Sequence, residues 1–353
     1  MKRQPTLVLN IEQIRPGDRI CAAVSGGADS VALLMALHAQ REGLGIGISA
    51  VHVHHGLRGI EADVDQTFVE ALCHRLDVPL HVRRVSVPVR AAEAGETTEE
   101  AARILRYEIF DSLLSSGAAD AVLTAHTRDD QAETVLMKLL RGAWTEGLGG
   151  ISPVVSTGAT LRSGIVRPLL SVSRSEIEEY LRALEQPWRE DDSNTDESFT
   201  RNRIRHSVLP LLRQENPSID QTLVNLAELA RDEESRWSFE LQRVLPQLLL
   251  PGRPVRGGGR SVPTSAGHPG ISLEIERLRT LDAALRRRVL RAAAKEVGVR
   301  LNFDETARLL ALCGFRQDPT VPSRPGTLIH LSNGLRAQRS ERELRLYLHV
   351  AHR

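Results

Sequence analysis

The sequence predicts an α/β protein: a Rossmann-like parallel sheet with helices on both faces, followed by a smaller, mostly helical C-terminal domain. Strand-like apolar runs alternate with helical stretches four times over the first half of the 353-residue chain. A Gly-Gly turn joins the first strand to the first helix, and the alternation stops near Ser156. Sheets of this kind bind ligands beyond the carboxyl ends of their strands.

The repeating unit can be placed along the chain from the spacing of its apolar residues. The expected strands are 20–24, 48–53, 79–87 and 121–125. The expected helices are 29–41, 62–76, 98–115 and 129–141. Each polar motif of this half lies at the carboxyl end of a predicted strand, so we expect the motifs to meet at one edge of the sheet.

The second half has a different texture. Ser173 and Glu176 fit a capping box at the start of a helix. The expected helices are 175–184, a segment carrying Arg201 to His206, 223–245, 281–297 and 304–312. Residues 251–270 are rich in Pro, Gly and Ser, which predicts a flexible linker. Two strand-like runs flank 332–334 and predict a β-hairpin. We place the domain boundary between residues 213 and 214.

Composition excludes several classes of protein. The net charge is +1 and the aromatic content is 3%, which argues against an extended base-stacking platform. No apolar run reaches the ~18 residues that span a membrane. The three cysteines, Cys21, Cys73 and Cys313, form no Cys-x-x-Cys pair, so neither a disulfide framework nor an iron–sulfur site is expected. We expect a cytoplasmic protein without a membrane partner.

The first motif is the turn Ser25-Gly26-Gly27-Ala28-Asp29-Ser30. Two glycines allow a phosphate close to the backbone, and the N–H groups of the first helical turn point at it. No Gly-Lys-Ser/Thr follows the glycines, so the motif is not a Walker loop. Asp29 can cap the helix or hold a metal ion. The sequence therefore predicts a nucleotide-binding loop, and a plain strand-to-helix turn is the alternative.

Two further motifs carry imidazoles and guanidinium groups. His54, His55 and Arg58 follow the second strand and could meet a nucleotide, or they could lie on the surface. Arg103 and Arg106 are three residues apart on one helical face. Such a pair can stabilise charge that develops on a phosphate. The alternative is a solvated face on which both arginines pair with neighbouring glutamates.

The fourth motif runs from the end of a strand into a helix. If the helix begins near Thr127, the residues that face the site are His126, Asp130 and Glu133 or Thr134. Carboxylates there could hold Mg²⁺ and accept a proton from an amine. In the alternative interpretation, the acidic residues only interact with the dipole at the helix start. We favour the catalytic interpretation because the glycine-rich loop ends a neighbouring strand.

Taken together, these motifs resemble the tRNA(Ile)-lysidine synthase family, whose pyrophosphate loop has the pattern Ser-Gly-Gly-x-Asp-Ser. The resemblance includes His-His-Gly-Leu-Arg at 54–58, Ala-Ala-Arg-x-x-Arg-Tyr at 101–107 and Ala-His-x-x-Asp-Asp-Gln-x-Glu-Thr at 125–134. It continues in Arg-Gly-x-x-x-x-Gly-Leu at 141–148, Arg-Pro-Leu-Leu at 167–170, Asp-Ser-Asn at 192–194 and Arg-Asn-Arg-Ile-Arg at 201–205. Thr127 stands where the family usually has a second histidine, so no role is assigned to it.

The resemblance implies a pyrophosphate-loop fold and an ATP-dependent carbon–nitrogen ligase. ATP would adenylate the carbon-2 oxygen of the wobble cytidine in tRNA(Ile) with a CAU anticodon, and free L-lysine would displace AMP. The implied ATP-binding residues are Ser25, Gly26, Gly27, Ala28, Asp29, Ser30 and His54. The implied catalytic residues are Asp29, Arg103, Arg106, His126, Asp130 and Glu133, with Mg²⁺ near Asp29 and Asp130.

The arginines of the second half complete the prediction. Arg201, Arg205, Arg286 and Arg287 are expected to hold tRNA phosphates, and ordinary surface charge is the alternative for each. The motifs leave two other functions open: a thiolase-like pyrophosphate-loop enzyme that modifies tRNA, and a catalytically inactive tRNA-binding protein. The sequence leaves the oligomeric state open, a homodimer included.

Overall fold

The computed structural model describes residues 5–57, 59–156, 164–190, 200–251, 253–254, 260–261 and 270–348. The chain divides into two compact units, Met1–Asp232 and Glu233–Arg353. The boundary between them falls within helix α10 (Ile219–Leu248). The sequence analysis places the boundary earlier, after residue 213. Arg58, the 192–194 motif and most of the predicted 251–270 linker lie outside the described residues.

The first unit is built on a six-stranded sheet of order β3-β2-β1-β4-β6-β5. Every neighbouring pair is parallel except β5 and β6, which confirms the predicted α/β class. The strands are β1 (Arg19–Ala23), β2 (Gly47–His54), β3 (Leu80–Arg84), β4 (Ala121–Leu123), β5 (Val154–Ser156) and β6 (Gly164–Val166). The chain fills one side of β1 with β2 and β3 and then crosses to the other side with β4. Such a reversal opens a crevice at the carboxyl ends of β1 and β4.

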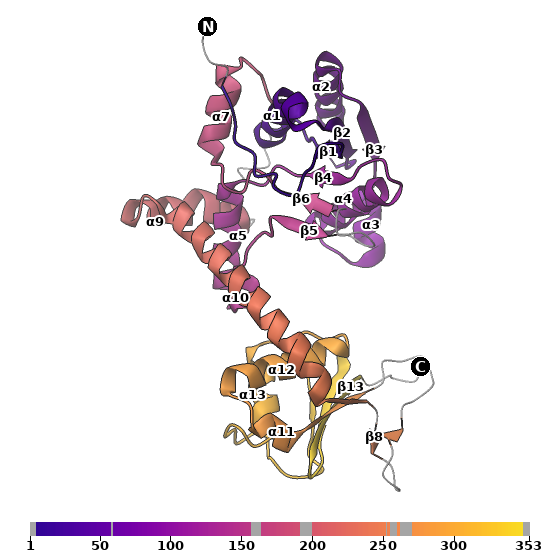
Figure 1. The fold of residues 1–353 in the computed structure, drawn as a ribbon, viewed down its shortest axis with the longest axis vertical. Coiled ribbons are helices and arrows are strands. Elements are labelled where there is room, and N and C mark those ends of the chain that lie inside the picture. The colour runs from indigo at the N-terminus through magenta and orange to yellow at the C-terminus, as the bar shows by residue number, and fades with distance from the viewer. Residues whose placement is uncertain are drawn as a thin grey trace. The chain divides into compact units, whose positions relative to one another are not determined.

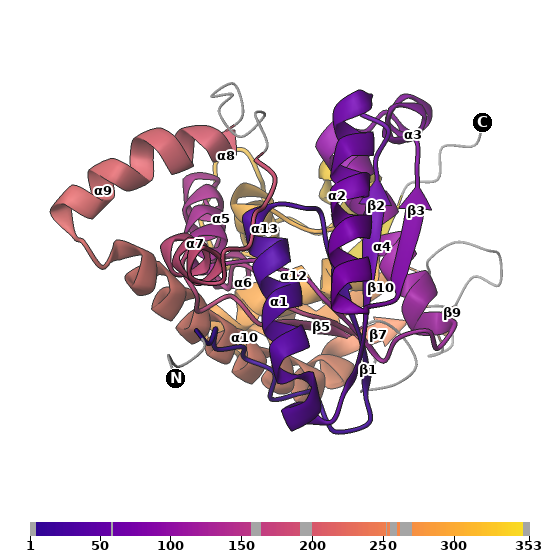
Figure 2. The same cartoon turned by 90° about the horizontal axis from the view of Figure 1, so that it is seen from above.

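Helices cover both faces of this sheet (Figure 1 and Figure 2). One face carries α1 (Ala28–Leu44), α2 (Ile60–Leu76) and α7 (Arg174–Ala183). The other face carries α3 (Val87–Ala94) and α4 (Thr98–Ser115). The predicted strand 79–87 ends at Arg84, because Pro88 starts helix α3 and proline favours the first turn of a helix.

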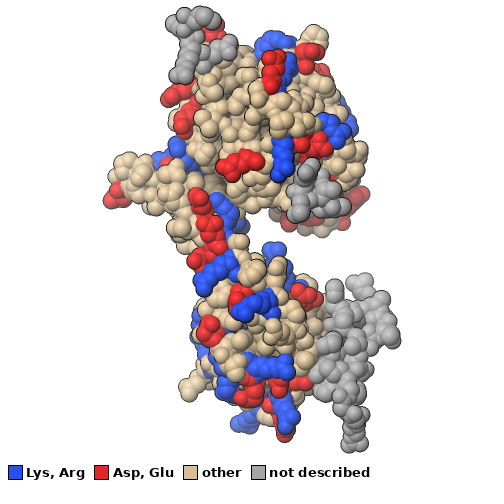
Figure 3. Space-filling model, in the orientation of Figure 1, with Lys and Arg blue, Asp and Glu red and all other residues tan. Residues whose placement is uncertain are grey.

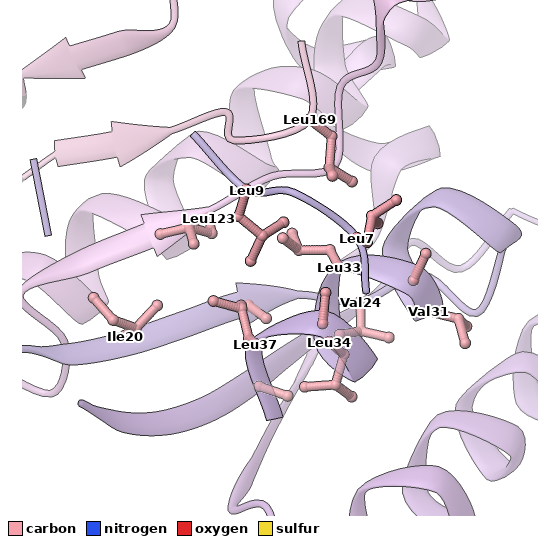
Figure 4. Packing of buried hydrophobic residues seen from close by; sticks show 14 of the residues in the cluster. Leu7, Leu9, Ile20, Val24, Val31, Leu33, Leu34, Leu37, Leu123 and Leu169 are labelled. Carbon is pink, nitrogen blue, oxygen red and sulfur yellow. The ribbon is translucent and has the colours of Figure 1, made fainter. Parts of the chain in front are cut away.

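The alternation along β1 explains the two layers. Ile20 packs in the cluster on the α1 face, whereas Cys21 packs with Phe110 of α4 on the opposite face. Leu7 and Leu9 of the N-terminal segment also join the α1-face cluster, which Figure 4 shows as a group of leucine, isoleucine and valine side chains turned toward one another. The sheet is thus buried on both sides, and its edge is left for polar residues.

The rest of the first unit is helical. The remaining elements are α5 (Arg128–Leu140), α6 (Thr145–Leu148), α8 (Thr200–Arg203), the π-helical segment η2 (Ile204–Val208) and α9 (Leu209–Glu215). The predicted capping box of Ser173 and Glu176 is confirmed at the start of α7. α5 packs against η2, α9 and the start of α10 through an apolar cluster that includes Val135, Ile204 and Leu223.

The second unit combines helices with a five-stranded antiparallel sheet of order β11-β12-β13-β10-β7. Its strands are β7 (Leu249–Pro251), β10 (Ile271–Glu274), β11 (Leu328–His330), β12 (Leu335–Arg339) and β13 (Glu343–Leu348). Its helices are α11 (Ile275–Arg279), α12 (Ala283–Glu296) and α13 (Phe303–Leu312). A short separate pair joins β8 (Arg253–Pro254) and β9 (Arg260–Ser261). The predicted hairpin around 332–334 is confirmed as β11 and β12, and it belongs to a larger sheet that the sequence analysis did not identify.

Charged residues are mixed on the surface. On the face shown in Figure 3, acidic and basic side chains are interspersed over both units. None of the helices in the described ranges is long and apolar enough to cross a membrane.

Candidate active site

A cleft of about 790 Å³ opens at the carboxyl ends of β1, β2 and β4. The polar motifs predicted to meet at this edge do so: residues of the 25–30 loop, His54, Arg103, Arg106, His126 and Asp130 all line the cleft. Arg201 and Arg205 line it as well, although they lie far along the chain. The cleft therefore brings together the candidate groups from both halves of the first unit.

The glycine-rich loop joins β1 to α1. Gly26 has φ +102°, a conformation that favours glycine, and Gly27 is the N-cap of α1. The Ser30 hydroxyl donates to the Gly27 carbonyl oxygen at 2.9 Å, and the Ser25 N–H donates to the Ser30 hydroxyl at 3.1 Å. The first amides of a helix have no acceptor within it, so those of α1 can bind an anion at the cleft.

Arg189, which also lines the cleft, supports this loop. Its backbone N–H donates to the Gly26 carbonyl oxygen at 2.9 Å. Its guanidinium group donates to Asp65 at 2.9 Å and to Glu61 at 2.8 Å, both on α2. Arg189 could not be predicted as a site residue from the sequence, because a single arginine after Trp188 has no local pattern that identifies it.

Asp29 has one carboxylate oxygen that no described residue contacts by a hydrogen bond. Asn and Asp often cap helices, but the N-cap of α1 makes no side-chain bond, and Asp29 Oδ1 is buried without a hydrogen-bond partner among the described residues. Burial raises the pKa of Asp29 to about 6. An orphaned carboxylate oxygen beside a phosphate-binding loop fits the coordination of Mg²⁺, which uses one or two carboxylates and substrate phosphates. Within the described ranges, no three His, Cys, Asp or Glu residues form a metal cluster.

Asp130 is held differently. α5 begins at Arg128 with Thr127 as its N-cap, close to the predicted start near Thr127. Asp130 completes a capping box in which its Oδ2 accepts the Thr127 N–H at 2.9 Å. Its Oδ1 accepts from Arg201 at 2.7 Å. Burial alone would raise the pKa of Asp130, but the Arg201 charge and the other neighbouring donors hold it below the ordinary value. Asp130 is thus an ionised carboxylate with both oxygens engaged.

His126 faces the same side of the cleft. Its Nδ1 lies 3.0 Å from the Thr124 hydroxyl at the end of β4. Burial lowers the pKa of His126 to about 4, so the imidazole is neutral at pH 7. The cleft therefore presents a neutral imidazole beside an ionised carboxylate.

Glu133 lies outside the lining of the main cleft and anchors two arginines. Its side chain is 1% exposed. Arg201 Nε donates to it at 2.7 Å, and Arg205 donates at 2.5 and 3.1 Å. Arg201 and Arg205 are four residues apart in α8 and η2, so both face α5. Glu133 orients the guanidinium groups that face the cleft.

A second group of arginines lies on and beside α4. Arg103 and Arg106 line the cleft, and neither guanidinium pairs with Glu99 or Glu100 in the described part of the chain. The Tyr107 hydroxyl accepts from Arg103 at 3.1 Å and from Arg167 at 2.8 Å. The predicted cationic pair therefore lies at the cleft. Tyr107 lines the cleft as well, and neither Tyr107 nor its partner Arg167 was predicted to have a role there.

The histidines at the end of β2 also line the cleft. His54 Nε2 lies 3.4 Å from Asp63. His52, which was not among the predicted site residues, lines the cleft too, and its buried Nδ1 lies 2.8 Å from the Val24 carbonyl oxygen. Burial lowers the pKa of His52, so its contact with Val24 is that of a neutral imidazole donating an N–H. His52 thereby joins β2 to the segment that precedes the phosphate-binding loop.

Two family models match this chain. The PP-loop domain family matches residues 3–212, and the TilS substrate binding domain family matches residues 273–324. A tRNA(Ile)-lysidine synthase of Nitratidesulfovibrio vulgaris is 38% identical over 277 residues, which is 75% of this chain and 78% of that protein. The chain belongs to the tRNA(Ile)-lysidine synthase family.

Other lysidine synthases agree. Those of Solibacter usitatus and Geobacter sulfurreducens are 42% and 36% identical over 278 and 333 residues, or 78% and 94% of this chain. The chain spans 56% of the length of the first and 65% of the second. Among solved structures, the U34-tRNA thiolase NcsA from Methanococcus maripaludis with its [4Fe-4S] cluster has a TM-score of 0.53 at 16% identity, over 64% of this chain and 76% of that one. This likeness concerns the fold alone.

The three cysteines lie away from the cleft. Cys21, Cys73 and Cys313 are all buried, and each packs in a different apolar cluster. None of them lines the cleft.

The two arginines predicted in the second unit have different surroundings. Arg286 donates to the carbonyl oxygens of Leu278, Arg279 and Leu281 at the end of α11 and lies 4.1 Å from the Phe315 ring centroid. Arg287 is exposed, and no partner is recorded for it in the described part of this unit. Of the two, Arg287 has the guanidinium group that is available to a phosphate.

Proposed function

We propose that this chain is a tRNA(Ile)-lysidine synthase. In this reaction ATP adenylates the carbon-2 oxygen of the wobble cytidine in a CAU anticodon, and free L-lysine then displaces AMP. The observation that supports it most is the meeting of three groups in one cleft: the phosphate-binding loop, the unpaired Asp29, and the His126–Asp130 pair with its arginines. Membership in the family supplies the substrates.

ATP would lie with its β- and γ-phosphates on the amides of the 25–30 loop, with His54 beside the nucleotide. Arg189 fixes the Gly26 carbonyl away from the ligand, which turns the following N–H in the opposite direction because the peptide is planar and trans. Asp29, and Asp130 beside it, would hold Mg²⁺ carried by ATP. Magnesium would neutralise phosphate charge.

In the first step, the carbon-2 oxygen forms a bond to the α-phosphorus and the bond to the β-phosphate oxygen breaks. Pyrophosphate leaves, and negative charge builds on the phosphate oxygens. Arg103 and Arg106 approach the cleft from α4, and Arg201 and Arg205 approach from α8 and η2. Guanidinium groups fixed before the reaction stabilise such charge without reorganisation.

In the second step, the ε-amine of lysine forms a bond to carbon 2, the carbon–oxygen bond breaks, and AMP leaves. A free lysine amine has a pKa of about 10.4, so it must lose a proton before attack. The carboxylate of Asp130 and the neutral imidazole of His126 line the cleft and can accept this proton. Both are fixed by hydrogen bonds, which suits a role in orienting the amine and taking its proton.

The RNA must present an unstacked base to the cleft, as in other single-stranded RNA recognition. Arg201 and Arg205 would meet its phosphates near the reacting base, and Arg287 would meet them in the second unit, where Arg286 already donates to carbonyl oxygens. Because tRNA, ATP and free lysine would be its substrates, we expect the enzyme to act in the cytoplasm.

The test is release of AMP from ATP in the presence of a CAU transcript, with and without lysine. We expect release that depends on lysine. Asp130→Asn should abolish adenylation while RNA affinity stays nearly unchanged, and Glu240→Gln, on a surface ion pair of the second unit, is the control. AMP that appears only with a sulfur donor would favour a thiolase. RNA binding without turnover in the wild type would favour an inactive binding protein. Equal turnover in Asp130→Asn would remove Asp130 from the mechanism.

A further inference from the structure

Tyr107 sits between two cations at the wall of the cleft. The hydroxyl oxygen accepts from Arg167 Nη2 at 2.8 Å and from Arg103 Nη2 at 3.1 Å. The Arg103 guanidinium carbon also lies 4.8 Å from the centroid of the Tyr107 ring. Both lone pairs of the phenol oxygen are thus occupied by charged donors.

Among the described residues, the Tyr107 hydroxyl hydrogen has no acceptor. A phenol can accept two hydrogen bonds and donate one, and no described residue takes the bond that Tyr107 can donate. The ring lines the cleft, so the hydrogen can be offered to a ligand there. Two guanidinium groups on the oxygen withdraw electron density and make the O–H a stronger donor.

Arg167 fixes the phenol from the protein side. It follows β6, its side chain is 4% exposed, and its Nη1 donates to the Ser152 carbonyl oxygen at 2.5 Å. Arg103 is exposed and closes the opposite side of the phenol. Arg167 is therefore buried, whereas Arg103 borders solvent. This arrangement fixes the phenol and leaves one side of it accessible to a ligand.

The position of Tyr107 indicates which ligand it meets. The β6 strand that precedes Arg167 pairs with β4, and His126 follows β4. The phosphate-binding loop follows β1, which pairs with β4 on the side away from β6. Tyr107 therefore lies on the side of His126 and Asp130, where the proposed acceptor base would enter, rather than on the side of the diphosphate.

We propose that the Tyr107 hydroxyl donates a hydrogen bond to N3 of the target cytosine and selects cytosine over uracil. This inference rests on the proposed function and names the recognition of its base. Cytosine N3 is an acceptor, whereas uracil carries N3–H, which would face the Tyr107 donor with a second hydrogen. A bond at N3 leaves the carbon-2 oxygen free to attack the α-phosphate. Arg103, stacked on the ring, holds the phenol in place.

The test measures RNA binding in the presence of a non-hydrolysable ATP analogue, so that it needs no turnover. Two transcripts are compared, one with a CAU and one with a UAU anticodon. Wild type should prefer CAU, and Tyr107→Phe should lose about 10-fold in affinity for CAU and little for UAU. The ratio of the two affinities is independent of the folded fraction of each preparation. Affinity for the ATP analogue should stay unchanged.

The matched control is Tyr347→Phe. Tyr347 lies in β13 of the second unit, with Arg345 4.7 Å from its ring centroid, so the same type of pair is altered away from the cleft. An unchanged CAU-to-UAU ratio in Tyr107→Phe, or a loss confined to the ATP analogue, would overturn the inference. A wild type that does not distinguish the two transcripts would also overturn it. A wild type that prefers CAU but releases no AMP with lysine would overturn the proposed function and leave Tyr107 as a reader of the base.

Discussion

Replacing Glu133 by glutamine tests whether this carboxylate positions the cleft arginines. The side chain keeps its shape and loses its charge. Glu133 is 1% exposed and accepts three hydrogen bonds from Arg201 and Arg205. The glutamine oxygen can keep part of this bonding, but its NH₂ group must face a guanidinium donor.

The magnitude follows from these contacts. Removing one partner of a buried ion pair costs about 3–5 kcal/mol. Arg201 keeps a bond of 2.7 Å to Asp130, and Arg205 keeps a contact of 3.5 Å to it, so part of the charge stays compensated. We therefore expect a loss of about 2–3 kcal/mol. For a unit of this size, this lowers Tm by roughly 5–10 °C.

The assay is thermal unfolding followed by calorimetry, together with lysine-dependent AMP release. Glu240→Gln is the control, because Glu240 pairs with Arg243 at 2.7 Å on the surface and such pairs contribute about 0–1 kcal/mol. Turnover of Glu133→Gln should fall even at temperatures where the variant is folded, because the arginines lose their orientation. A variant that unfolds with wild type and turns over equally would refute the anchoring role.

Three further predictions concern stability and RNA binding. Gly150→Ala should lower the free energy of unfolding by about 2–3 kcal/mol in denaturant unfolding, because φ is +64° and the new Cβ would lie 2.5 Å from Gln131 Oε1. Gly142→Ala should lower it by only about 1 kcal/mol, because φ is +71° and no atom lies within 4 Å of the new Cβ. Equal midpoints for the two would contradict this. Burial would raise the pKa of Glu305, but hydrogen-bond donors, including the backbone N–H groups of Asn302 and Ser332, hold it below its ordinary value. Glu305→Gln should therefore be less stable than wild type above about pH 4.5. The difference in the free energy of unfolding between the two should shrink as the pH falls below that value. A gap that widens in acid would exclude this role. Arg287→Ala should weaken RNA binding and reduce the slope of log affinity against log salt by about 1, measured by salt titration, and an unchanged slope would count against a phosphate contact.

The first unit was predictable because its signals are local. Each strand–helix step has an apolar run, a turn and an amphipathic helix within about 30 residues. The helix 98–115 has the same bounds as α4. By contrast, β6 has only three residues, and its partners β4 and β5 are decided by the sheet and not by its own sequence. The sheet of the second unit escaped prediction for the same reason, because β10 pairs with β13 across the whole unit.

The site divides in the same way. The motif at 25–30 and the one at 126–130 could be read from the sequence, since each places several polar groups at a strand end. Arg189 meets Asp65 across 124 positions, and Tyr107 meets Arg167 across 60. Such contacts depend on the folded sheet, and no spacing rule within one element indicates them.

The three carboxylates of the motifs show what only the structure adds. Asp29, Asp130 and Glu133 have the same chemistry and were predicted together as catalytic groups. In the fold, one Asp29 oxygen has no partner among the described residues, Asp130 divides its oxygens between a helix cap and Arg201, and Glu133 is buried beneath two guanidinium groups. A cation can therefore approach Asp29 without breaking a bond, whereas at Asp130 it must compete with Arg201. The same loss of charge should then affect cation binding at Asp29, chemistry at Asp130 and stability at Glu133, because the partners of a carboxylate, and not its type, decide what it can do.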